Sequence, residues 1–136
     1  MFGMTKKQFL KKSKDCLKDT GIELLLIRKL FYQENQGKIN TAEAFQKLEK
    51  NRKSLENIFF KYEDLKSPSK CKPLHMKILK TIIILQEALV INSEYLSSIK
   101  DSGELESKKL EKSLAKLEQF KDEFKKLSIE VDSYLK

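Results

Sequence analysis

A heptad repeat governs residues 104–135, which read ELESKKLEKSLAKLEQFKDEFKKLSIEVDSYL. Apolar side chains recur on two positions of this repeat: Leu110, Leu117, Phe124 and Val131 on one, and Phe120, Leu127 and Tyr134 on the other. Most of the remaining positions carry Lys, Glu or other polar residues. This spacing predicts a long amphipathic helix whose apolar seam faces other helices.

Three further helical segments precede it. Residues 5–35 and 41–66 show apolar stripes at helical spacing, and residues 73–101 are apolar over most of the helix circumference, which is typical of a core helix. Few Gly and Pro residues are present, which argues against a sheet protein. The sequence therefore predicts an all-α fold, an elongated up-down-up-down four-helix bundle in one domain of 136 residues, with helices at about 5–35, 41–66, 73–101 and 104–135.

Short breaks separate these segments. Gly37 supplies a stop for the first helix, and Asn40 resembles the start of a capping box for the second. Residues 67–73 contain both prolines of the chain, and residues 101–103 form the last expected turn. Connections this short favour antiparallel neighbours.

Positive charge is concentrated near the start of the chain. The whole sequence has 28 Lys plus Arg against 20 Asp plus Glu, a net charge of +8. Residues 1–38 hold nine of the basic residues and four of the acidic ones. Spacings of four, three and four residues place one group of lysines on a single helical stripe, where they are the candidate binding residues for an anionic ligand. This lysine stripe consists of Lys7, Lys11, Lys14 and Lys18.

The sequence contains no recognisable catalytic or metal-binding motif. His75 is the only histidine, and Cys71 and Cys16 are the only other soft ligands, too few and too far apart along the expected bundle for a zinc site. We therefore expect no metal or cofactor, two free thiols, and a His75 ring packed at one end of the bundle with a nitrogen on a backbone carbonyl or water. Without a nucleophile elbow or a Gly-rich phosphate loop, we expect neither an enzyme nor a small-molecule substrate.

The sequence also shows no recognisable membrane span or export signal. Residues 1–7 lead directly into a charged helix without the apolar region of a signal peptide. The most apolar stretch, residues 81–91, is interrupted by Gln86 and Glu87 and is shorter than a membrane span. The expectation is a cytoplasmic protein without a membrane span; the alternative is the cell envelope or the extracellular space if a signal segment has been removed.

Part of the chain resembles small Lys-rich helical-bundle proteins of Gram-positive bacteria, many of which are envelope lipoproteins of unknown function. The resemblance covers roughly residues 38–136. It rests on residues 38–44, which open a Lys/Leu/Glu helix, on Pro68 and residues 74–79, and on the turn at 101–103. It implies a bacterial helical bundle and brings no catalytic residue with it.

Two functions remain open at this point. The first is a non-enzymatic protein–protein interaction module that binds another protein or itself through exposed apolar seam residues, because heptads can continue into a partner helix. The alternative is an electrostatic binder of nucleic acid or of an anionic surface through the lysine stripe. Nucleic acid is the less favoured ligand, because Arg28 and Arg52 are the only arginines.

Overall fold

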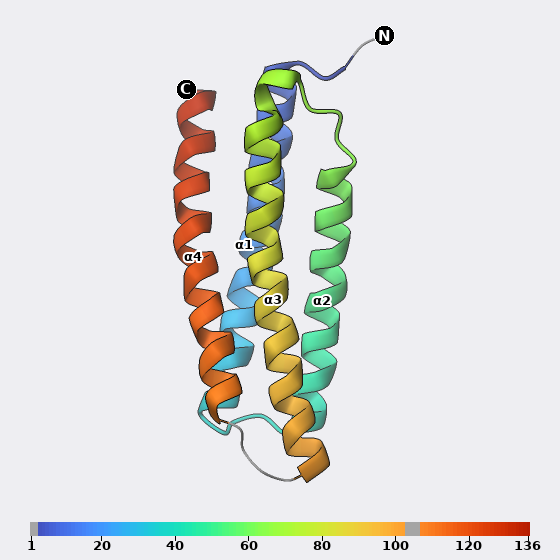
Figure 1. The fold of residues 1–136 in the computed structure, drawn as a ribbon, viewed down its shortest axis with the longest axis vertical. Coiled ribbons are helices and arrows are strands. Elements are labelled where there is room, and N and C mark those ends of the chain that lie inside the picture. The colour runs from blue at the N-terminus through green and yellow to red at the C-terminus, as the bar shows by residue number, and fades with distance from the viewer. Residues whose placement is uncertain (1–2, 103–106) are drawn as a thin grey trace.

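The computed structural model describes residues 3–102 and 107–136 of the chain. In these residues the predicted all-α four-helix bundle is confirmed, without any strand (Figure 1). The elements are α1 (Lys6–Asn35), α2 (Thr41–Glu63), the short 3-10 helix η1 (Ser69–Cys71), α3 (Lys72–Ser102) and α4 (Ser107–Leu135).

Consecutive helices run antiparallel, and α1 packs against α4 to close the bundle. The pairs α1–α2, α2–α3, α3–α4 and α1–α4 form the main contacts, whereas α1 and α3 lie on a diagonal and touch much less. Figure 1 shows the start of α1, the α2–α3 connection and the end of α4 at the same end, here called the terminal end. The α1–α2 connection lies at the opposite end, here called the loop end.

Side-chain caps set the first residues of α1 and α2. The Thr5 hydroxyl accepts a hydrogen bond from the Gln8 backbone N–H, and the Gln8 side chain accepts one from the Thr5 N–H. This reciprocal pair is a capping box. At α2, the Asn40 side chain accepts a hydrogen bond from the Glu43 N–H at 2.8 Å, so that Asn40 caps the helix as expected from the sequence.

Gly37 ends α1 because its backbone takes a conformation that other residues rarely adopt. Its φ angle is +65°. The Gly37 N–H donates to the Glu34 carbonyl, and the Lys38 N–H donates to the Gln33 carbonyl. These two bonds form a Schellman motif, which satisfies carbonyls at the end of the helix.

The predicted end of the second helix, at residue 66, is wrong, because α2 stops at Glu63. The Leu65 N–H donates to the Tyr62 carbonyl in a tight turn, and Ser67 follows as a buried residue. Pro68 also biases Ser67 away from helical conformation. The chain therefore leaves the helix early enough to bring the Ser67 side chain back onto the bundle.

Helices α1 and α3 differ from their predicted bounds by smaller amounts, and α1 begins at Lys6 rather than at residue 5. Helix α3 spans Lys72–Ser102, one residue longer at each end than the predicted 73–101. The predicted start of the last helix, at residue 104, lies outside the described residues, and within them α4 begins at Ser107.

Helix α3 supplies buried side chains to both parts of the core. The cluster toward the loop end includes Leu85, Leu89 and Leu96, and the cluster toward the terminal end includes Ile78 and Ile82. All five are at most 2% exposed. This confirms the expected placement of the most apolar segment inside the bundle.

Gly21 lies where α1 and α4 come close together. A Cβ atom at this position would be 3.2 Å from Cζ of Phe124. Glycine lowers helix propensity, yet α1 continues through Thr20 and Gly21 as one helix. The absence of a side chain at Gly21 instead makes room for the Phe124 ring.

We expect Leu85→Ala to lower the free energy of unfolding by about 2–5 kcal/mol, because it removes a fully buried side chain and leaves a cavity. Urea unfolding followed by circular dichroism measures this. Val90→Ala on the exposed side of α3 is the control, with an expected loss of about 0.5 kcal/mol or less. Equal losses in the two variants would contradict the placement of α3.

Candidate protein-interaction surface

The lysine stripe lies on the outer side of α1, and all four of its side chains are exposed. Lys14 forms an ion pair with Asp132 of α4, with 3.2 Å between Nζ and Oδ1. Within residues 3–102 and 107–136, the other three lysines form no ion pair. The structure thus leaves Lys7, Lys11 and Lys18 available to an anionic ligand and partly neutralises Lys14.

An exposed apolar patch continues the same face of α1 beyond the stripe. Ile22, Leu25 and Leu26 are 52%, 65% and 50% exposed, whereas their neighbours Leu24 and Ile27 are buried. We call these three exposed side chains the α1 patch. The sequence interpretation did not single it out. The signal was present, because four consecutive apolar residues at 24–27 cannot all face one side of a helix.

The α1 patch and the lysine stripe form one surface. Ile22 follows Lys18 by four residues, and Leu26 follows Ile22 by four more, so that the three side chains lie one turn apart along the helix. Beyond the patch, Arg28 and Lys29 are again exposed. The outer face of α1 is therefore basic, then apolar, then basic along its length.

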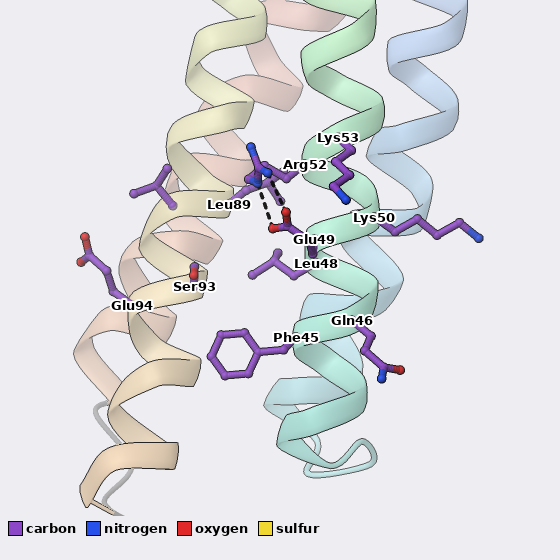
Figure 2. Close-up of a pocket in the computed structure, with 11 residues that line it drawn as sticks. Phe45, Gln46, Leu48, Glu49, Lys50, Arg52, Lys53, Leu89, Ser93 and Glu94 are labelled. Carbon is purple, nitrogen blue, oxygen red and sulfur yellow. Dashed lines mark hydrogen bonds and ion pairs between the residues drawn. The ribbon is translucent and has the colours of Figure 1, made fainter.

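A groove lies between α2 and α3 (Figure 2). Its volume is about 750 Å³. Figure 2 shows Phe45 pointing from α2 toward α3, with Leu48 and Leu89 between the two helices. The groove therefore has an apolar floor, toward the loop end of the bundle.

Two of the charged side chains at this groove, Arg52 and Glu49, are engaged with one another. The Arg52 guanidinium donates to both carboxylate oxygens of Glu49, at 2.6 and 2.9 Å, and to Glu56 at 3.0 Å. These bonds hold the pKa of Glu49 below its ordinary value. Arg52 and Glu49 are therefore already paired with protein groups and are less available to orient a small ligand.

The His75 side chain is buried at the terminal end of the bundle, where it bonds and packs against protein groups. Its Nε2–H donates to the Tyr62 carbonyl at 2.8 Å, so in the neutral ring Nδ1 accepts from the Ser67 hydroxyl at 3.0 Å. The ring also meets Phe9 and Tyr62 edge-on, with centroid separations of 5.2 and 4.8 Å. The expected packing of His75 against a backbone carbonyl is confirmed. Among the described residues, no group of three or more His, Cys, Asp or Glu side chains could hold a metal ion.

The two cysteines are buried near this cluster as free thiols, as expected. Burial raises the pKa of the Cys16 thiol to about 12, which keeps it protonated and unreactive. Burial also raises the pKa of Tyr62, whose hydroxyl shares a 2.7 Å hydrogen bond with Ser13. The Ser13 hydroxyl donates in turn to the Phe9 carbonyl, so Tyr62 is the donor to Ser13.

Where the structure describes the chain, it contains no helix both long and apolar enough to cross a membrane.

We expect His75→Ala to lower the free energy of unfolding by about 2–3 kcal/mol, because the buried Ser67 hydroxyl loses its partner, the Tyr62 carbonyl loses one donor and keeps the Leu65 N–H, and the ring no longer packs there. Urea unfolding measures this loss of stability. Repeating it with a metal chelator tests whether a bound metal ion contributes to stability. The chelator should leave the unfolding midpoint of the unchanged protein where it is. A large shift on chelation that is present in the unchanged protein and absent in His75→Ala would show that His75 binds a metal ion.

Comparison of the chain with protein-family models, with curated proteins and with solved structures yields no match. The resemblance of residues 38–136 to bundle proteins of Gram-positive bacteria therefore remains a prediction.

Proposed function

We propose that this protein is a non-enzymatic interaction module and that the outer face of α1 binds a partner protein. The observation that carries this proposal is the exposed α1 patch of Ile22, Leu25 and Leu26. Burying one such aliphatic side chain contributes roughly 1.5–3 kcal/mol. Three neighbouring ones are enough to anchor a partner helix lying along α1.

The charges around the patch define the chemistry of the partner. Lys7, Lys11 and Lys18 approach it from one side, and Arg28 and Lys29 follow on the other. A complementary helix has aliphatic residues at its centre and acidic residues toward its ends. Such charge matching mainly speeds association and excludes wrong partners, while the apolar centre supplies affinity.

A second copy of the chain fits this surface less well. Each copy carries a net charge of +8, and pairing two outer faces of α1 sets one basic surface against another. Duplex nucleic acid offers phosphates to the lysines but no apolar counterpart to Leu25 and Leu26. An acidic, amphipathic protein helix matches both parts of the surface.

We expect the double variant Leu25→Ser, Leu26→Ser to weaken partner binding about 10- to 100-fold, because it removes buried apolar contacts worth roughly 1.4–2.8 kcal/mol. To find the partner, a photo-crosslinking amino acid at position 22 is used in the cells that make the protein. Mass spectrometry identifies the joined segment, and titration of the purified partner gives the affinities.

The control is Ile129→Ser on α4, where an isoleucine of similar exposure, 63%, lies away from the α1 patch. It should leave both the crosslink and the affinity unchanged. The proposal is supported when the joined segment is an acidic helix and the double variant loses it. It fails when position 22 forms no adduct, joins only a second copy, or joins the same partner equally well in the double variant.

The second candidate function is electrostatic binding of nucleic acid or of an anionic surface. The observation in its favour is that Lys7, Lys11 and Lys18 are exposed and have no ion-pair partner among the described residues. This candidate needs only the lysine stripe and makes no use of the α1 patch.

For duplex DNA, we expect the electrostatic candidate to give a slope of log affinity against log salt of about −2.7 for three phosphate contacts, or about −3.6 if Lys14 releases Asp132 and joins them. Fluorescence anisotropy at several salt concentrations measures the slope. Changing Lys7, Lys11, Lys14 and Lys18 to Glu should abolish this binding without unfolding the bundle. Submicromolar DNA affinity that is lost in the four-Glu variant would favour this candidate over the interaction module.

A further inference from the structure

A polar cluster lies inside the bundle toward the loop end, among side chains that are otherwise apolar. Asn92 of α3 is 0% exposed and Glu34 of α1 is 8% exposed. The Asn92 side-chain amide donates to Glu34 Oε1 at 2.7 Å and to the Ser113 hydroxyl of α4 at 3.3 Å. Ser113 donates onward to the Leu110 carbonyl at 2.8 Å. Three helices therefore meet at the Asn92 side chain.

Two oxygen atoms of this cluster have no hydrogen-bond partner. They are Glu34 Oε2 and Asn92 Oδ1, and both are shielded from solvent. Both are acceptors when Glu34 is ionised, so neither can satisfy the other. They belong to the two groups that the 2.7 Å bond already joins. One added proton changes this, because a carboxylic acid and an amide can exchange two hydrogen bonds.

We propose that Glu34 is a proton-binding site: the folded bundle holds a neutral carboxyl there, which donates a second hydrogen bond from Oε2 to Asn92 Oδ1. The closed acid–amide pair then satisfies both otherwise unpartnered oxygens. A buried carboxylate without a cationic partner is costly, and taking up a proton is the usual way to avoid that cost.

The groups around Glu34 favour this assignment. From α3, the titratable neighbour is Tyr95, whose pKa is raised by burial and by the charge of Glu34. From α4 the neighbour is the neutral Ser113, and α2 contributes Ala44 and Leu48 to the same cluster. Burial raises the pKa of Glu34 to about 7, and the hydrogen bond from Asn92 opposes that rise only in part. Within the described residues, no lysine or arginine contributes to the shift.

The raised pKa of Glu34 determines the direction in which the stability of the fold changes with pH. A carboxyl whose pKa is higher in the folded than in the unfolded chain stabilises the fold below the unfolded value, near 4.5, and loses that contribution as pH rises through about 7. Each unit of difference is tenfold in the unfolding equilibrium. We therefore expect the Glu34 contribution to the unfolding constant to rise roughly 200-fold between pH 4 and pH 8.

The test compares the pH dependence of urea unfolding in the unchanged protein, Glu34→Gln and Glu118→Gln. A glutamine at position 34 imitates the neutral acid, because its amide can donate to Asn92 Oδ1 while its carbonyl accepts from Nδ2. Glu34→Gln should lose this roughly 200-fold change in the unfolding constant and be the more stable protein at pH 8. Glu118, exposed on α4, is the matched control, and its variant should keep the pH dependence.

A second measurement follows the Glu34 carboxyl group itself in the unchanged protein. Carbon-13 labelling of the glutamate carboxyl groups allows their titration to be followed by NMR in the unchanged protein, with Glu34→Gln used only to assign the Glu34 signal. A Glu34 carboxyl that titrates near pH 7 supports the proposal. A titration near 4.5, or an unchanged pH dependence in Glu34→Gln, overturns it. Neither result depends on whether a partner binds the α1 patch.

Discussion

The need to cover α3 governs the architecture. This helix is apolar over most of its circumference, so it is stable in water only when neighbours cover several of its sides. Helices α2 and α4 cover two of them, and α1 closes the bundle across the diagonal. The three covering helices can then be strongly charged on their outer sides, which explains how a chain with 35% charged residues still forms a continuous core.

The apolar repeats were sufficient to predict the fold, because the spacing of Leu and Phe residues directly specifies which side of each helix is buried. The helix boundaries also followed from local chemistry where a cap uses neighbouring residues, as at Asn40 and Gly37. The end of α2 did not, because it depends on Ser67 meeting His75, two residues whose contact exists only after the α2–α3 connection has folded. Local propensity contains no information about such a contact.

The candidate sites were predicted unevenly for a related reason. The lysine stripe was found because its regular spacing is visible in the sequence, whereas the adjoining α1 patch was not singled out. The Glu34–Asn92 pair was also missed, although both residues fall on the buried phase of their helices. In a sequence, polar residues at such positions only interrupt the apolar repeat. Their pairing across the bundle becomes evident when the three-dimensional arrangement is known.

Gly21 has a consequence for how α1 and α4 are held relative to one another. With only a hydrogen atom at Gly21, the Phe124 ring occupies a notch in the surface of α1, and this ring contacts both halves of the core. Sliding either helix along its axis by one residue would drive the ring against a side chain. The notch thus favours one axial register of the two helices, which heptad seams alone specify poorly because successive turns present similar side chains.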